Sequence, residues 1–299
     1  MVRRLLVYLL LFLSIVEFVG VFSGGVGFAM VASLIGRSVF YMVLGVIVYC
    51  VFSGDIGLFF IGGLGLTASL DVMLKTILNM PRPPVSEWLV KAEGPGFPSG
   101  HAAMSFSFAL LAAYATRDKV LGLALLIHSF AVSYSRLVLH VHYPIDVIGG
   151  AVIGVVSALV SIYLYMRISD PSKYLLAVSV PSLLMSLISS YKMPDYKDSP
   201  LLLGLSLSLI LAGIYMTHYR GDYLYRKENI YRVAILVISF AGLLLTLVLE
   251  STNYFPMILL GGLLFGLIVL LSRPLMDRII RKKMAPGAGF EPAHPSTGQ

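Results

Sequence analysis

The stretch GFPSGHAAMSFSFALL, residues 96–111, places a proline, a serine, a glycine and a histidine directly before a long apolar run. Ser99 is a residue type that caps helix N-termini, and Gly100 allows a close approach of the backbone. A helix that begins here points its free N–H groups and the positive end of its dipole outward, which favours an anion. The stretch therefore predicts a capped helix start that binds an anion, with His101 in its first turn.

Apolar residues dominate the rest of the chain as well. Of its 299 residues, 58% are hydrophobic and 12% are charged, whereas soluble domains carry about 25% charged residues. Runs long enough for transmembrane helices recur along the chain. We therefore predict an all-α, polytopic transmembrane helical bundle of about ten spans. The predicted spans are residues 5–22, 39–53, 56–79, 101–116, 120–139, 144–166, 174–190, 200–217, 233–250 and 256–272, and the glycine-rich segment 24–38 is predicted to lie at the membrane interface.

The cysteine content and the charge distribution exclude several classes of protein. The single cysteine, Cys50, lies in an apolar run, which excludes an intrachain disulfide and a thiolate metal cage. The formal net charge is +7, but the basic residues follow a membrane topology. With Arg3 and Arg4 in the cytoplasm, most of the 22 lysines and arginines lie on the cytoplasmic side. We expect a cell-membrane protein with both termini in the cytoplasm and no nucleic-acid partner.

The basic residues on the outer side run against that bias and need a reason. Lys75, Arg82 and Arg136 lie on the same outer face as His101 and His142. Each of the three cations, taken singly, is equally well read as an anchor whose charged end reaches the membrane surface. Together they form a cluster of cations beside two histidines, which suits a phosphate group. The outer basic residues are Arg37, Lys75, Arg82, Lys91, Arg136, Lys192 and Lys197.

The sequence HYPID, residues 142–146, predicts a second helix start on this face. Proline is favoured at the first helical position, so Asp146 would be the third residue of the helix and could fold back over its start. It could then hold one ring nitrogen of His142 and leave the other free to attack. The alternative is a carboxylate that merely favours a helix N-terminus. Pro81 should end the helix that carries Lys75, so that Arg82 can turn back over the site.

Three motifs together resemble the signature of the type 2 phosphatidic acid phosphatase superfamily, which also includes undecaprenyl diphosphate phosphatases, glucose-6-phosphatase and the vanadium haloperoxidases. The motifs are K-x6-RP at residues 75–83, PSGH at residues 98–101 and SR-x5-H-x3-D at residues 135–146. Every signature position is filled, in the family's order, and the resemblance covers about residues 39–166.

The resemblance implies a six-helix phosphatase core that hydrolyses a lipid phosphate or diphosphate through a phosphohistidine, without a metal ion or other cofactor. His142 would be the nucleophile and Asp146 would orient it, while His101 would protonate the leaving oxygen and then deprotonate water. The residues implied to bind the substrate phosphate are Lys75, Arg82, Ser99, Gly100 and Arg136.

We divide the chain into a phosphatase core (1–170), additional transmembrane helices of unknown role (171–284) and a disordered tail (285–299). Because the active surface is predicted at the outer membrane boundary, the expected partner is a membrane lipid substrate. Phosphatidate-type lipids, phosphatidylglycerophosphate and polyprenyl diphosphates remain open, as does a homodimer. The alternatives are a lipid phosphotransferase that uses the same histidine and a transporter or scaffold with a vestigial site.

Overall fold

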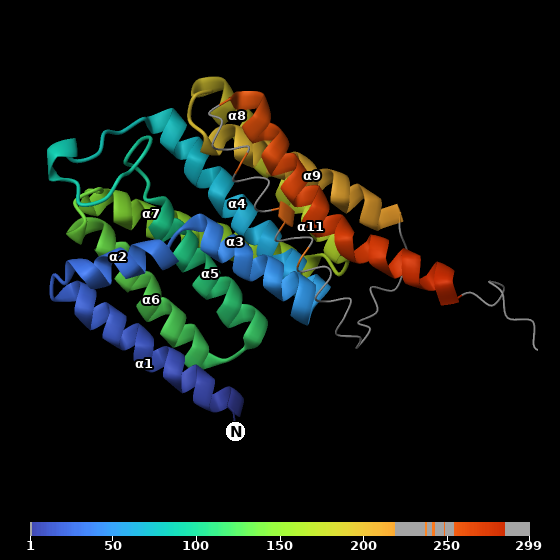
Figure 1. The fold of residues 1–299 in the computed structure, drawn as a ribbon, viewed down its shortest axis with the longest axis horizontal. Coiled ribbons are helices and arrows are strands. Elements are labelled where there is room, and N and C mark those ends of the chain that lie inside the picture. The colour runs from blue at the N-terminus through green and yellow to red at the C-terminus, as the bar shows by residue number, and fades with distance from the viewer. Residues whose placement is uncertain (1, 219–236, 238–240, 243–247, 249–253, 285–299) are drawn as a thin grey trace, which may run out of the picture.

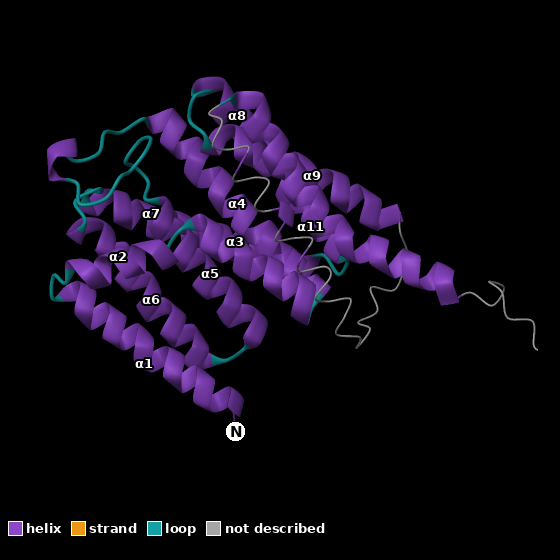
Figure 2. Cartoon of the chain, viewed as in Figure 1, coloured by secondary structure: helices purple, strands orange, loops and turns teal. Residues whose placement is uncertain are grey.

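The computed structural model describes residues 2–218, 237, 241–242, 248 and 254–284 (Figure 1). Within these ranges the chain is helical and contains no strand, which confirms the predicted all-α class (Figure 2). A π-helical turn (Val48–Phe52) follows α3, and a 3₁₀ turn (Val85–Glu87) lies between α4 and α5. The α-helices are α1 (Val2–Phe22), α2 (Val26–Ile35), α3 (Ser38–Ile47), α4 (Gly54–Leu78), α5 (Gly100–Thr116), α6 (Lys119–Val138), α7 (Pro144–Arg167), α8 (Pro171–Lys192), α9 (Asp198–His218) and α11 (Phe255–Met284).

Six of the described helices, α1, α4, α6, α7, α8 and α9, are long and apolar enough to cross a membrane, so the chain is a membrane protein. The segment 39–53 differs from its prediction as a separate span. It forms the second half of a pair, α2 and α3, that passes the same test only together and is bent by 48°. The predicted span at 101–116 is the 17-residue helix α5, and 256–272 lies within α11. The predicted span 233–250 and the tail 285–299 lie essentially outside the described residues.

The helices that carry the three motifs begin and end at residues that are typical of helix boundaries. α4 stops at Asn79, whose φ of 43° places it in the left-handed region, two residues before Pro81. α6 begins after Asp118, whose carboxylate accepts the N–H groups of Val120 and Leu121 at 3.1 Å. α7 begins with Pro144 at its first position, as predicted. The long loop between α4 and α5 is therefore at the same end of the bundle as the α6–α7 connection (Figure 2).

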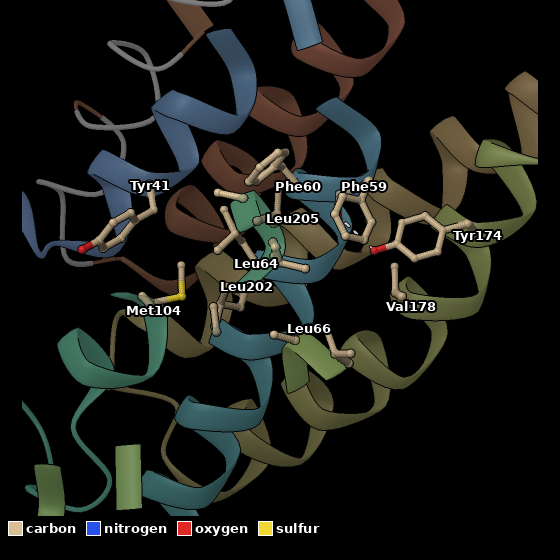
Figure 3. Close-up of a cluster of buried hydrophobic side chains, with 14 of the residues drawn as sticks. Tyr41, Phe59, Phe60, Leu64, Leu66, Met104, Tyr174, Val178, Leu202 and Leu205 are labelled. Atoms are coloured by element: carbon tan, nitrogen blue, oxygen red, sulfur yellow. Dashed lines mark hydrogen bonds between the residues drawn. The ribbon is translucent and has the colours of Figure 1, made fainter. Parts of the chain in front are cut away.

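α4 is the central helix of the bundle and is buried along most of its length. The main hydrophobic cluster surrounds it and includes Phe59 and Leu64 from α4, Tyr174 from α8 and Leu202 from α9 (Figure 3). The core therefore continues across residue 170, because α8 and α9 pack directly on α4. α1, by contrast, exposes most of its apolar side chains, as expected of a helix that faces lipid.

Small residues allow α5 and α7 to approach closely just below the predicted site. A Cβ atom on Gly150 would lie 2.3 Å from the carbonyl oxygen of Ser99, and one on Gly154 would lie 2.2 Å from that of Ala103. Glycines one helical turn apart are a common means of close packing between membrane helices. This contact places the start of α7 directly against the start of α5, where two of the three motifs lie.

A buried cluster of hydroxyl groups joins α4, α5 and α7, three of the four helices that carry the motifs. Thr67 Oγ1 of α4 lies 2.8 Å from Ser107 Oγ of α5 and 2.7 Å from Ser157 Oγ of α7. All three residues are buried. Hydrogen bonds between membrane helices typically contribute about 0.6 to 2 kcal/mol each. The cluster therefore stabilises the packing that supports the site.

We expect Thr67→Val to lower the free energy of unfolding by about 1 to 2 kcal/mol, because it removes the hydroxyl shared by two partners while keeping the side-chain volume. The measurement is the thermal unfolding midpoint of the purified protein. Thr76→Val is the matched control, since Thr76 is also buried on α4 but bonds only to the carbonyl of Met73 in its own helix. Equal losses in the two variants would show that the interhelical bonds contribute nothing of their own.

A second polar contact fastens α1 to the bundle. Nδ1 of His128 on α6 lies 2.7 Å from Oε2 of Glu17 on α1, and its Nε2 lies 3.2 Å from the hydroxyl of Tyr41 on α3. Sequence analysis alone identifies no partner for Glu17. The contact gives one carboxylate oxygen of Glu17 a partner within the apolar part of the bundle, where a polar group without a partner is costly, while Oε1 is buried without one.

Candidate active site

The predicted site residues meet at one end of the bundle. They come from the last turns of α4 and α6, the first turns of α5 and α7 and the loops next to them. Hydrogen bonds join the three motifs to one another. Lys75 donates to the carbonyl of Pro98, the N–H of Ser99 donates to the carbonyl of Asp146 at 2.8 Å, and Arg82 contacts His142 at 2.8 Å. The residues brought together are Lys75, Arg82, Ser99, Gly100, His101, Arg136, His142 and Asp146.

Lys75 lies in the last turn of α4, with only 4% of its surface exposed. Its ammonium group is 2.8 Å from Oδ1 and 3.0 Å from Oδ2 of Asp71, four residues earlier. Residues four apart lie on the same face of a helix, which is why the two side chains can pair. Since Lys75 also donates to Pro98, the lysine connects α4 to the PSGH motif.

Arg82 reaches back over the site from the α4–α5 loop, as its position after Pro81 predicts. Its Nε and Nη2 atoms donate to the carbonyls of Gly94 at 3.0 Å and Glu93 at 2.9 Å. Its Nη1 atom donates to the carbonyl of Val141 at 2.9 Å and faces Nε2 of His142. The guanidinium group therefore holds the loop closed and places a positive charge beside the histidine.

Ser99 stands at the N-cap of α5 as predicted, but without the capping hydrogen bond that is usual for serine. The hydroxyl is fully buried and has no hydrogen-bond partner. Gly100 follows in a tight space, where a Cβ atom would lie 2.8 Å from Oδ2 of Asp71. The Ser99 hydroxyl is thus available as a donor to another group at the start of α5.

Arg136 lies in the last turn of α6 with 4% of its surface exposed. Its Nη1 atom donates to the hydroxyl of Ser33 on α2, and its Nε atom has no partner although it is buried. Ser33 has no recognisable motif around it and could not be identified from the sequence. Because buried N–H groups are nearly always paired, the Nε–H of Arg136 is a donor suited to a ligand.

His142 is held from both sides of its ring. Nδ1 lies 3.2 Å from Oδ2 of Asp146, and the same oxygen accepts the N–H of Tyr143 at 2.9 Å. This confirms that Asp146 folds back over the start of α7. Nε2 lies on the opposite side, 2.8 Å from Arg82. Since an arginine can only donate, Nε2 carries the lone pair and Nδ1 carries the proton.

Burial lowers the pKa of His142 below its ordinary value of 6.5, and the positive charges of Arg82, Lys75 and Arg136 act in the same direction. The hydrogen bond to Asp146 opposes this effect. A lowered pKa keeps the imidazole neutral at neutral pH. Its Nε2 lone pair is therefore available for attack.

His101 lies in the first turn of α5, on the same side of the bundle as His142. The charges that act on it are those of Arg136, His142, Lys75 and Arg37. Gly36, at the bend between α2 and α3, lies against its ring: a Cβ atom there would be 3.3 Å from Cδ2 of His101. The second imidazole and these cations are therefore near enough to His101 for their charges to act on it.

One region of the chain is similar to a known protein family. Residues 56–170, which contain all of these motifs, match the PAP2 superfamily. This part of the chain is similar to the PAP2 superfamily. It is the family of type 2 phosphatidic acid phosphatases that the three motifs resemble.

A curated relative of the PAP2 region is the lipid A 4′-phosphatase of Bacteroides thetaiotaomicron, which is 44% identical over 61 residues. The match covers 20% of this chain and 27% of that relative, so the chain spans about a quarter of the length of the curated protein. No solved structure matches the chain.

Tyr196, from the loop between α8 and α9, lies against the PAP2 site and could not be identified from the sequence. A Cβ atom on Gly94 would be 2.4 Å from Cε2 of Tyr196, and Gly94 has a φ of 66° that glycine adopts readily. Burial raises the pKa of the tyrosine well above its ordinary value, and the charges of Asp198 and Asp71 add to this. A residue beyond the PAP2 region therefore packs on the loop that carries Arg82.

The lowered pKa of His142 predicts a shift in pH dependence. The neutral nucleophile is lost only as the pH falls through the lowered pKa, so kcat/KM should persist below pH 6.5 on the acid side. Arg82→Gln removes one of the charges that lower the pKa, so its acid limb should move to higher pH. Comparing normalised pH–rate profiles of the two enzymes on one substrate cancels the ionisation of the substrate. An unchanged or lower acid limb in Arg82→Gln would contradict the prediction.

Proposed function

We propose that the chain is an integral membrane phosphatase that removes phosphate from a lipid phosphate or diphosphate through a phosphohistidine intermediate. The observation that carries the proposal is the geometry of His142. Its Nδ1 faces Asp146 and its Nε2 faces Arg82, beside the start of α5. An imidazole oriented by a carboxylate on one nitrogen is the arrangement of an activated nucleophile.

In the first step, Nε2 of His142 forms a bond to phosphorus while the bond from phosphorus to the lipid oxygen breaks. His101 donates a proton to that oxygen, and the lipid leaves as an alcohol or, from a diphosphate, as a monophosphate. Asp146 stabilises the positive charge that develops on the ring of His142. The guanidinium of Arg82, which contacts Nε2 in the free protein, is close enough to transfer to a phosphate oxygen.

In the second step, the oxygen of a water molecule forms a bond to phosphorus while the phosphorus–nitrogen bond breaks. His101, now neutral, accepts a proton from that water. Inorganic phosphate leaves, and both histidines return to their starting protonation states. An imidazole can both donate and accept a proton, so it suits both tasks.

Charge stabilisation in this reaction is assigned to the chain's own donors. Phosphoryl transfer depends mostly on positioning and on neutralising the charge of the phosphate oxygens. The Ser99 hydroxyl and the Nε–H of Arg136 are buried donors without a partner. Among the described residues, no group of three or more His, Cys, Asp or Glu side chains is arranged to hold a metal ion. We therefore propose that hydrolysis continues in the presence of a chelator.

The similarity to a lipid A 4′-phosphatase and the apolar helices around the site favour a lipid as the substrate over a soluble ester. The test is a phosphate-release panel on the purified protein with EDTA, using phosphatidate, phosphatidylglycerophosphate, a polyprenyl diphosphate and lipid A. Release from at least one lipid supports the proposal. Transfer of phosphate to an alcohol in place of release would indicate a phosphotransferase. No reaction with any substrate would overturn the proposal.

We also propose that the site lies on the extracytoplasmic side of the cell membrane. Arg4, Arg117 and Lys119 line a hollow at the end of the bundle that is opposite His101, since α5 separates the two ends. Basic residues near span ends are retained in the cytoplasm.

A cysteine introduced at the exposed Asp195, in the α8–α9 loop, should react with a membrane-impermeant maleimide added to intact cells. Lys119→Cys, at the opposite end, should react only after the cells are opened. The native Cys50 is buried and gives a low background. The reverse labelling pattern would place the site in the cytoplasm.

A further inference from the structure

An apolar groove lies beside the candidate site, between α3, α4, α5, α9 and α11. Its volume is about 160 Å³. Met42 of α3, Val72 of α4, Met104 of α5 and Leu202 of α9 are among the residues that line it. Met104 and Leu202 belong to the main hydrophobic cluster and are drawn in Figure 3. The sequence motifs give no sign of this groove, because α9 and α11 lie beyond the PAP2 region.

The groove borders the candidate active site through Asp71. This residue lines the groove and also holds the ammonium group of Lys75 at 2.8 Å. Met104 lies three residues after His101 on the same helix, which corresponds to a rise of about 4.5 Å. The groove therefore begins about one helical turn from the groups that face a bound phosphate. Asp198, whose charge acts on Asp71, is the other carboxylate among the lining residues.

Part of the wall of the groove is exposed at the surface of the bundle. Val39 of α3 lines the groove and is 45% exposed. An apolar space with an open apolar edge favours hydrocarbon over water, which needs several polar partners in order to be held. A cavity of about 150 Å³ with apolar walls holds benzene, which has six carbon atoms. The groove is thus wide enough for a single chain and for about six of its carbons.

We infer that this groove binds the first part of one hydrocarbon chain, alkyl or isoprenoid, of the lipid whose phosphate enters the candidate site. The inference rests on the proposed function and extends it to the chain of the substrate. It also gives a role to α9 and α11, which form one wall of the groove. These helices pack closely, since a Cβ atom on Gly262 of α11 would lie 2.2 Å from the carbonyl oxygen of Leu201.

The test compares two substrates with the same phosphate group, dodecyl phosphate and propyl phosphate, on the full chain in nanodiscs. Val39→Trp fills the groove from its edge. It should lower kcat/KM for dodecyl phosphate at least about tenfold, because burial of several methylene groups is lost, and change that for propyl phosphate less than about twofold. Retained activity on propyl phosphate shows that the variant folds. Val43→Phe, one turn further along α3, is the second variant.

Phe40→Trp is the matched control, since Phe40 is the next residue on α3, is 40% exposed and is not part of the groove lining. It should leave both substrates unaffected. If Val39→Trp and Val43→Phe change neither substrate, or lower both equally, the inference is overturned.

A binding measurement separates this inference from the proposed function. A dodecyl phosphonate with a photoreactive diazirine on its sixth carbon is not hydrolysed, and it should label peptides of α3 and α9 in the wild type but not in Val39→Trp. If the wild type releases no phosphate from either substrate yet shows this labelling, the proposed function fails and the groove inference stands. Labelling that Val39→Trp does not alter would overturn the groove inference.

Discussion

His142→Ala is expected to lower phosphate release from the lipid substrate at least about 1,000-fold, because it removes the atom that forms the bond to phosphorus. The remaining charges can still bind the substrate, so the loss should appear in kcat more than in KM. The assay is phosphate release by the purified protein in the presence of EDTA. Activity within tenfold of the wild type would exclude His142 as the nucleophile.

His140→Asn is the matched control for this variant. His140 lies two residues away, but its side chain is exposed, and its φ of 55° is a conformation that asparagine tolerates. The control should keep wild-type activity.

His101→Asn with an aryl phosphate, whose leaving group needs no proton, should accumulate the phosphohistidine, because the second step then lacks its base. An acid-labile phosphate on the protein that is absent in His142→Ala would identify the intermediate.

Arg136→Lys is expected to lower kcat/KM about 100-fold, although it keeps the positive charge. Arg136 is buried, one of its nitrogens donates to Ser33, and its Nε–H has no partner within the protein. A lysine cannot keep the Ser33 contact and also present a second donor at a fixed angle. Loss of one fixed donor to a developing oxyanion typically costs a factor of about 100 to 1,000.

Arg37→Lys provides the comparison, because Arg37 acts on His101 and Arg136 through its charge and is itself exposed. It should change kcat/KM less than about threefold, since charge is retained. If Arg136→Lys also stays within threefold, then charge alone matters at position 136 and the proposed donor geometry is wrong. Ser33→Ala should give a loss between the two, because it frees the guanidinium group to turn.

Contacts between residues about one helical turn apart could be predicted from the sequence alone. Asp146 folds back to the N–H of Tyr143 and holds His142 because proline defines the first position of α7 and four residues span one turn. Asp71 pairs with Lys75 for the same reason. The spacing of such residues decides whether they can meet, whatever lies around them.

The N-cap position of Ser99 was predicted correctly, but its lack of a capping hydrogen bond was not, because the residue is placed by another helix. Gly150 of α7 packs against the carbonyl of Ser99, and the N–H of Ser99 donates to the carbonyl of Asp146. The hydroxyl is buried at that contact and makes no capping bond. A serine before a helix is usually a cap when water surrounds it, and the sequence does not say that a neighbouring helix replaces the water.

Composition and short-range spacing predicted that this chain is a helical membrane protein, that helices start at Gly100 and Pro144, and that cations and histidines gather at one end. Those properties depend on how apolar each segment is and on residues one turn apart. Only the tertiary structure decided that Arg82 faces His142, that Tyr196 packs on Gly94 and that α9 and α11 border the groove. Apolar helices can pack on one another in many ways, and the close approaches at small residues select one of them.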